Sequence, residues 1–199
     1  MGAPTNARIK GTALMPVLSW YADSFGKGAF ASALSRMSPE VRSEFSLEDG
    51  VPHLLPSAWY DVRLAHALLD ETLGAAPSTE RHRIAREAAR AGVTASARGI
   101  YRFMLAQLGS PELYARHLQR VWSLHHSGGT REVRIVAPGE ADSDIRDWPG
   151  HHPLLCALTN ETMAAVFEVM GAKQVMLRRE QCISEGAPLC RTHVSWTMR

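Results

Sequence analysis

The sequence predicts an α+β fold in which a helical N-terminal half packs on an antiparallel sheet, and three observations support this prediction. Helical patterns fill the chain as far as about residue 125. Polar and apolar residues then alternate strictly, which places Val133, Ile135 and Ala137 on one face of an expected strand. An amphipathic segment over 153–170 precedes a closing hairpin, so the C-terminal half is ordered strand, strand, helix, strand, strand.

The N-terminal half is expected to be almost entirely helical. Residues 1–7 are predicted to be disordered, and 8–199 to form a single domain. The first expected elements are a strand over 8–15, a helix over 16–25 followed by Gly26 and Gly28, and a helix over 29–45 with a restart at Ser38-Pro39-Glu40. A loop over 49–56 and a helix over 57–73 capped by Ser57 come next. Two further helices are expected, one from Thr79 and one over 99–108.

The C-terminal half opens with a clear helix start, Ser110-Pro111-Glu112, in which serine suits the cap and proline the first turn. Gly128-Gly129 ends that helix, a strand follows over 131–138, and 140–148 is expected to pair with it. One side of the helix is predicted to carry Tyr114, His117, Leu118, Val121, Trp122 and His125. Gly171 ends the helix over 153–170, and the hairpin closes the fold.

Composition narrows the function only broadly. Hydrophobic residues make up 45% of the 199 residues, which is enough for a core, and the net charge of +2 does not favour a nucleic-acid surface. No apolar run is long enough for a membrane span, and the N-terminus lacks the apolar core of a secretion signal. We therefore expect a cytoplasmic, reducing environment, no nucleic-acid partner and no membrane span.

The chain has three cysteines, Cys156, Cys182 and Cys190, and they are its most informative residues. A turn near 185–187 places Cys182 and Cys190 across a hairpin, where facing Cβ atoms lie about 4.5–5.5 Å apart. That placement suits a shared metal ion, ordinary core packing or a disulfide. In a reducing compartment, an odd number of cysteines favours thiols or a metal site over a disulfide framework.

The C-terminal half carries a series of residues that resembles a known family. The series comprises Ser110-Pro111-Glu112, Trp122, Gly128-Gly129, Cys156, Gly171 and the ending Cys182-x3-Gly186-x3-Cys190-x3-Val194-x-Trp196. It resembles the 4-vinyl reductase domain and is similar in layout to a myxobacterial paralogous family related to haem–nitric-oxide-binding proteins. Trp59-Tyr60 stands in a similar place to that family's aromatic pair.

The resemblance implies a fold shared with vesicle-tethering adaptors and with ligand-sensing domains of bacterial regulators. In aromatic-sensing regulators with this domain, three cysteines and a glutamate bind zinc beside the effector pocket. Here the position of that glutamate, three residues before the second cysteine, is Arg179, and Glu180 follows it. On a regular strand Glu180 would share a face with Cys182.

A structural Zn²⁺ site is therefore predicted at Cys156, Cys182 and Cys190, because thiolates favour tetrahedral zinc. Glu180 leads as the fourth ligand, and His193, His151 and His152 are further candidates. Three buried cysteines in a plain core remain a second interpretation.

A ligand pocket is predicted between the helices and the sheet, lined by aromatic and histidine side chains. The candidate residues are Trp59, Tyr60, His66, Tyr101, His117 and Trp122. His117 is also the candidate axial ligand for haem. Haem is expected to be unlikely because the Tyr-x-Ser-x-Arg signature of haem–nitric-oxide sensors is absent, and Tyr114-Ala115-Arg116 does not fit it.

These observations favour a sensor or signalling domain that binds a hydrophobic or aromatic small molecule and has no catalytic activity of its own. Two further functions stay open. The first is a dimerising adaptor of the same fold without a small ligand, and the second is an accessory protein in tetrapyrrole reduction. A protein partner or a homodimer is expected for the sensor and for the adaptor.

Overall fold

The computed structural model describes residues 6–44, 46–49, 51–96 and 109–198. Its N-terminal half is mainly helical, with two small two-stranded sheets. The elements are β1 Arg8–Lys10, α1 Gly11–Phe25, α2 Lys27–Arg36, α3 Pro39–Arg42, β2 Ser46–Glu48, β3 Val51–His53, β4 Trp59–Asp61, α4 Val62–Glu71 and α5 Ser78–Ser96.

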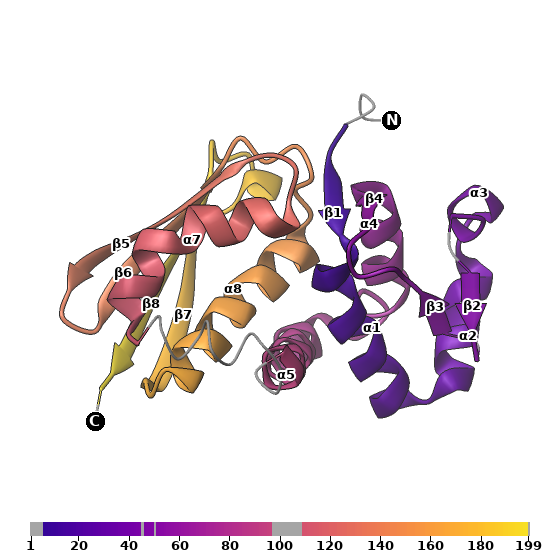
Figure 1. Cartoon of the computed structure of the whole chain (residues 1–199), viewed down its shortest axis with the longest axis horizontal. Coiled ribbons are helices and arrows are strands. Elements are labelled where there is room, and N and C mark those ends of the chain that lie inside the picture. The colour runs from indigo at the N-terminus through magenta and orange to yellow at the C-terminus, as the bar shows by residue number, and fades with distance from the viewer. Residues whose placement is uncertain (1–5, 45, 50, 97–108, 199) are drawn as a thin grey trace.

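The C-terminal half contains a four-stranded antiparallel sheet in the order β5-β6-β8-β7. Its elements are α7 Pro111–His125, β5 Thr130–Ala137, β6 Glu140–Arg146, α8 Pro153–Val169, β7 Lys173–Gln181, the 3-10 turn η1 Ile183–Glu185 and β8 Cys190–Thr197. Figure 1 shows α7 and α8 beside this sheet, with α5 between α8 and α1. The predicted α+β class is therefore confirmed. Among the described residues, no helix is long and apolar enough to cross a membrane.

The two long C-terminal helices begin where their local sequence caps them. The Oγ of Ser110 accepts a hydrogen bond from the backbone N of Leu113 at 3.3 Å, as the Ser-Pro-Glu sequence predicted. In α8 the cap is His152, whose Nδ1 accepts from the backbone N of Leu154 at 3.3 Å. Proline fills the first position of both helices, where its missing N–H costs no hydrogen bond.

Strand β8 is central to the sheet, and it turns alternate residues towards the helices. The buried residues of β8 are Cys190, Thr192, Val194 and Trp196. At one end of the strand the ring of Trp196 meets Phe167 of α8 edge-on, with centroids 5.1 Å apart. At the other end Cys190 is only 1% exposed. A single strand register therefore fixes both the aromatic core and the position of a thiol.

The first strand is shorter than predicted, and the helix begins early. Residues 11–15 belong to α1 rather than to a strand over 8–15. Gly11 is required there, because a Cβ would lie 2.2 Å from the carbonyl oxygen of Leu55. Ala7, which the sequence placed in a disordered tail, is buried, and its carbonyl accepts from the backbone N of Val62 at 3.1 Å.

The predicted helix over 57–73 is divided by a strand. Trp59 and Tyr60 lie in β4, where Tyr60 pairs with Ile9 of β1. The helix α4 starts only at Val62, and Asp61 is its cap. Likewise, the expected loop over 49–56 contains β3, which pairs with β2. Pairing with the distant strand β1 decided the first case, whereas a local hairpin with β2 decided the second. The predicted helix over 99–108 lies outside the described residues.

An aromatic cluster joins the N-terminal strand to the C-terminal half. The Trp122 ring stacks on His126 at 3.9 Å and meets Trp148 edge-on at 4.9 Å. His126 also forms an isolated bridge with Ile9 of β1. Burial lowers the pKa of His126 to about 3, with smaller contributions from His125 and Arg131. The cluster therefore requires a neutral imidazole at this position.

We expect His126 to make the protein sensitive to acid. The unfolded chain binds a proton at this histidine below about pH 6.5, whereas the folded chain does so only near pH 3. The contribution of His126 is therefore complete above about pH 6.5 and declines as the pH falls towards 3. The loss should reach on the order of 3–5 kcal/mol. Urea unfolding at a series of pH values should show a shallower decline for His126→Phe than for the wild-type protein.

His117→Phe is the matched control, because His117 lies exposed on the same helix. It should keep the pH slope of the wild-type protein. Equal slopes for His126→Phe and the wild type would contradict the role given to the buried imidazole.

Candidate functional site

Four side chains converge at the end of the sheet nearest the start of α8. They are His151, Cys156, Cys182 and Cys190, and their ligand atoms all lie within 4.8 Å of one another. The Sγ atoms of Cys182 and Cys190 are 3.6 Å apart, and Nε2 of His151 is 3.5 Å from Sγ of Cys182. A tetrahedral ion with bonds of about 2.3 Å would hold its sulfur ligands roughly 3.8 Å apart. The separations of Cys182 from Cys190 and from His151 match that value closely, and no pair in the group exceeds 4.8 Å.

Different elements deliver the four side chains, and local structure fixes each one. Cys156 lies in the first turn of α8, where its backbone N donates to the carbonyl of His152 at 2.8 Å. Cys182 and Cys190 flank the turn η1, which ends at Gly186 with a φ of 85°. His151 precedes the α8 cap, and its ring meets Trp148 edge-on at 5.6 Å. All three thiols are at most 2% exposed.

Neighbouring polar groups support the sulfur atoms. The backbone N of Ile183 donates to Sγ of Cys190 at 3.3 Å, and Nδ2 of Asn160 donates to Sγ of Cys156 at 3.7 Å. The Oγ of Ser184 is 3.1 Å from Sγ of Cys182. Donors aimed at sulfur stabilise its thiolate form, which is the form that binds metal.

The three thiols differ in acidity because they share hydrogen bonds. The Cys156 thiol lowers the pKa of Cys190 to about 4, and His151 and the Ile183 amide act in the same direction. The same hydrogen bond, together with burial, raises the pKa of Cys156. In the absence of metal, Cys190 is therefore the thiolate that its neighbours stabilise.

Glu180 does not join the cluster, although it was the leading candidate for the fourth ligand. The pairing of β7 with β8 shifts register between Arg179 and Gln181, so the expected alternation with Cys182 breaks there. The carboxylate of Glu180 instead pairs with Arg178 at 2.8 Å.

Of the three histidines that the sequence offered for the fourth position, only His151 reaches the sulfur atoms. His152 pairs with Asp70 at 3.2 Å, and His193 pairs with Asp142 at 3.0 Å. His151 therefore occupies the fourth position of the cluster.

Among the described residues, the predicted pocket side chains do not meet in one cavity. Trp59 is 38% exposed, with the Lys10 ammonium 5.3 Å from its ring. The hydroxyl of Tyr60 accepts from the backbone N of Leu55 at 2.7 Å. His66 donates to the carbonyl of Gly150 at 3.1 Å. None of these contacts joins two of the predicted pocket residues.

The remaining pocket candidates are similarly dispersed. His117 is exposed, so it does not share the buried face of Tyr114 and Trp122 as the helical pattern predicted. Trp122 belongs to the aromatic cluster, and its Nε1 donates to the carbonyl of Gly128 at 3.0 Å. Tyr101 lies outside the described residues. Ligand contact by these six residues stays a prediction.

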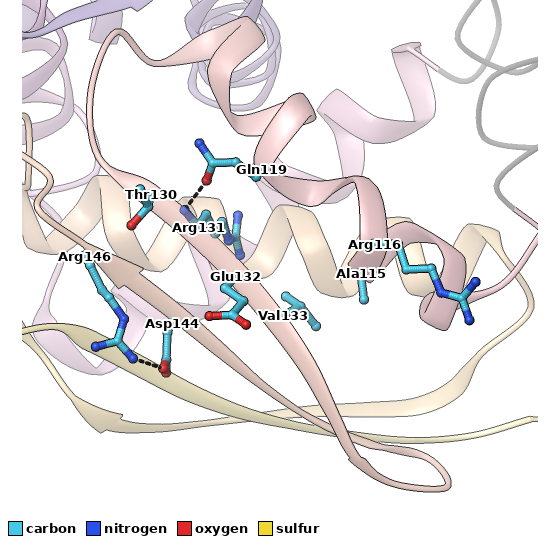
Figure 2. Close-up of a pocket in the computed structure, with 9 residues that line it drawn as sticks. All are labelled: Ala115, Arg116, Gln119, Thr130, Arg131, Glu132, Val133, Asp144 and Arg146. Carbon is cyan, nitrogen blue, oxygen red and sulfur yellow. Dashed lines mark hydrogen bonds and ion pairs between the residues drawn. The ribbon is translucent and has the colours of Figure 1, made fainter.

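Two open hollows on the described part of the chain are well defined, and neither involves the predicted pocket residues. The larger, of about 410 Å³, follows the edge strand β5 (Figure 2). It is lined by Ala115, Arg116 and Gln119 of α7, by Thr130, Arg131, Glu132 and Val133 of β5, and by Asp144 and Arg146 of β6. The smaller, of about 320 Å³, lies among α1, β2 and β3. Neither of the two is the predicted apolar cavity between the Trp59 and Trp122 elements.

The sequence patterns gave no sign of a buried carboxylate on the outer face of the sheet. Asp144 is 1% exposed and accepts two hydrogen bonds from Arg191, each 2.7 Å long. Arg146 lies 2.7 Å away, and Arg134 lies 3.6 Å away. The hydrogen bond from Arg191 is the main reason that the pKa of Asp144 lies below its ordinary value. Cross-strand pairing brings these charges together.

We expect Asp144→Asn to destabilise the protein by about 2–4 kcal/mol, because it leaves three arginines around a neutral amide. The carboxylate contributes fully above its unfolded pKa, and this contribution is lost as the pH falls below that value. Urea unfolding at neutral pH provides the measurement. Glu180→Gln, which removes one ion pair at the surface, should cost less than about 1 kcal/mol. Equal losses for the two variants would contradict the importance given to Asp144.

Comparison with known proteins identifies the fold. No family model and no curated protein matches the sequence. Solved structures of H-NOX proteins do match. One, the Fe(II) unliganded protein from K. algicida, has a TM-score of 0.70 and 14% identity, covering 96% of this chain and 98% of that one. Another, the S. oneidensis protein in the Fe(II)NO state, has a TM-score of 0.64 and 10% identity, covering 95% and 99%.

An oxygen-binding H-NOX domain related to soluble guanylate cyclases also matches, with a TM-score of 0.62 and 10% identity over 95% of both chains. The predicted relation to the haem–nitric-oxide-binding fold is therefore confirmed at the level of the fold. The resemblance to the 4-vinyl reductase domain stays a prediction, since no family model matches.

The expectation that haem is unlikely is wrong, because these proteins of the same fold are described by their iron and haem states. Three of the described histidines have contacts that do not suit an axial role. His117 faces solvent, His126 lies between two tryptophan rings, and His66 is bonded to a backbone carbonyl. We derive no haem-dependent step from these residues.

Proposed function

We propose that this chain is a small-molecule sensor or signalling domain in which a structural Zn²⁺, bound by Cys156, Cys182, Cys190 and His151, fixes the C-terminal hairpin to α8. The convergence of these four side chains is the observation that carries the proposal. The sensor part is supported by the shared fold, since its solved examples include an oxygen-binding domain and an Fe(II)NO complex.

The donor set favours zinc over harder metals. Three thiols and one imidazole are soft and borderline ligands, and Zn²⁺ accepts both at tetrahedral geometry. Mg²⁺ and Ca²⁺ would require oxygen ligands, which this group lacks. Four protein ligands complete the coordination, so a structural role is favoured over a catalytic one.

The ion would connect two parts of the chain that are far apart in sequence. Cys156 and His151 belong to the start of α8, whereas Cys182 and Cys190 belong to the hairpin of β7 and β8. A shared ion would fix the helix relative to the sheet. Because ligand geometry forms only in the folded chain, zinc binding would contribute directly to folding stability.

A dimerising adaptor without a small ligand is the second candidate. The observation that favours it is the packing of Trp122 against His126 and Trp148, where a ligand cavity was predicted. Sedimentation of the purified protein with and without a small-molecule screen separates the two functions, since the adaptor requires a stable dimer and binds no small ligand.

We expect about one Zn²⁺ per chain in protein purified without chelator and with reductant present. His151→Ala and Cys182→Ala should lose the metal, whereas Glu180→Gln should retain it. At free zinc about 1,000 times the Kd, binding adds about 4 kcal/mol to stability. Each loss of about 1 kcal/mol lowers the Tm of a chain of this size by about 2–4 °C. Elemental analysis and thermal unfolding provide the measurements.

The comparison between His151→Ala and Glu180→Gln is decisive, because each changes one of the two candidates for the fourth ligand. If Glu180→Gln loses zinc and His151→Ala retains it, the fourth ligand is the Glu180 carboxylate and not His151. A wild-type chain without zinc would refute the proposed centre. Iron with haem absorbance in its place would indicate a different prosthetic group.

A further inference from the structure

Arg131 is a buried cation without a carboxylate partner. Its residue is 5% exposed. Its guanidinium donates to Oγ of Ser143 at 3.4 Å, to the carbonyl of Thr159 at 3.4 Å and to Oδ1 of Asn160 at 3.1 Å. A fourth contact, to Sδ of Met163, is 3.5 Å long. All of these acceptors are neutral.

No aspartate or glutamate side chain supplies the missing counter-charge. No acidic side chain of the described residues lies within 4.0 Å of the Arg131 guanidinium, and residues 1–5, 45, 50, 97–108 and 199 include no aspartate or glutamate. Arg86 and Arg90 also reach α8, but each has a glutamate there, at positions 161 and 168. Arg131 therefore differs from these two arginines because it has no ion pair with a carboxylate of the described residues.

An unpaired buried charge costs several kcal/mol, so a compensating anion is expected nearby. Burial lowers the pKa of Arg131, and only Tyr114 and Cys156 act against this shift. The Tyr114 hydroxyl is protonated near neutral pH, because burial raises its pKa. Cys156 would supply a negative charge as a metal-bound thiolate, and Asn160 lies between its sulfur and the guanidinium.

Asn160 connects the guanidinium to this sulfur. Its Oδ1 accepts from Arg131, and its Nδ2 donates to Sγ of Cys156 at 3.7 Å, one helical turn away on α8. Hydrogen bonds in series polarise one another in a buried site. The amide therefore transmits the positive charge of Arg131 towards Cys156.

We propose that Arg131 is the counter-charge of the Cys156, Cys182, Cys190 and His151 metal centre and that it acts through Asn160. The inference rests on the proposed zinc site. A Zn²⁺ bound by three thiolates and a neutral imidazole carries one net negative charge, which a single guanidinium balances. Arg131 is thus a positioning residue, and it favours three deprotonated sulfurs around the ion.

The test is the release of Zn²⁺ from the full chain as the pH is lowered, followed with a chromophoric zinc chelator. Zinc binding displaces thiol protons, so a group that stabilises thiolates keeps the metal bound to lower pH. Arg131→Met should weaken zinc affinity at neutral pH by about 10- to 100-fold, as expected for partners of metal ligands. Its pH of half-release should move upward. Arg131→Lys, which keeps the charge, should recover much of the wild-type affinity.

Arg86→Met is the matched control, because Arg86 bonds Glu161 of the same helix but is not connected to a cysteine. It should lower stability without moving the pH of half-release. Asn160→Asp provides a second variant of nearly equal shape. It gives Arg131 a carboxylate, which preserves folding, but it places a negative charge beside Cys156 and removes the amide donor. Its pH of half-release should therefore also move upward.

The outcomes separate the two proposals. If wild-type protein binds no zinc, the proposed centre fails and the inference fails with it. If wild-type protein binds zinc while Arg131→Met and Asn160→Asp release it at the pH of Arg86→Met, the centre stands and the role of Arg131 is overturned. Should Arg131→Met not fold, an unchanged pH of half-release in Asn160→Asp would by itself overturn the role of Arg131, and Arg131→Lys tests whether its charge suffices.

Discussion

The packing of α8 on the inner face of the sheet is the constraint on which the rest of the C-terminal half depends. Strand β8 lies between two other strands, and its inward residues are buried because α8 covers that face of the sheet. At one end Trp196 meets Phe167, and at the other Cys190 approaches Cys156. A slip of one residue in the register of β8 would turn all of these side chains to the opposite face. The aromatic core and the thiol cluster therefore depend on the same register.

The same packing explains where polar groups are buried. Arg131 and Ser143 lie on the inner face of neighbouring strands and bond each other and α8. One residue further along β6, Asp144 points outward, and three arginines cover it. The two faces bury charge differently, because the inner face contains a cation with neutral partners and the outer face contains an anion with several cations. Only the inner cation lacks a neighbouring opposite charge, which the proposed thiolate cluster would supply.

Much of the C-terminal half could be predicted because its signals are local. The cap at Ser110, the alternation in β5 and the glycine after α8 each involve residues close in sequence. The N-terminal half was harder. Trp59 and Tyr60 have no local pattern that separates strand from helix, and pairing with Ile9 decides their conformation. His117 is spaced by three residues from Tyr114 and by four from Val121, which favoured the same face, but it lies five residues, or about 140° of helical rotation, from the buried Trp122 and is exposed.

The sequence by itself determined that Cys182 and Cys190 would face each other across a hairpin, because strand alternation and turn position follow from neighbouring residues. Cys156 reaches them only because α8 packs on the sheet. Tertiary structure alone decided the fourth member of that group. The register shift in β7 turns Glu180 away, and the approach of the α8 start brings His151 in, and neither can be deduced from spacing along the chain. The same holds for Arg131, whose isolation from carboxylates is a property of three-dimensional packing.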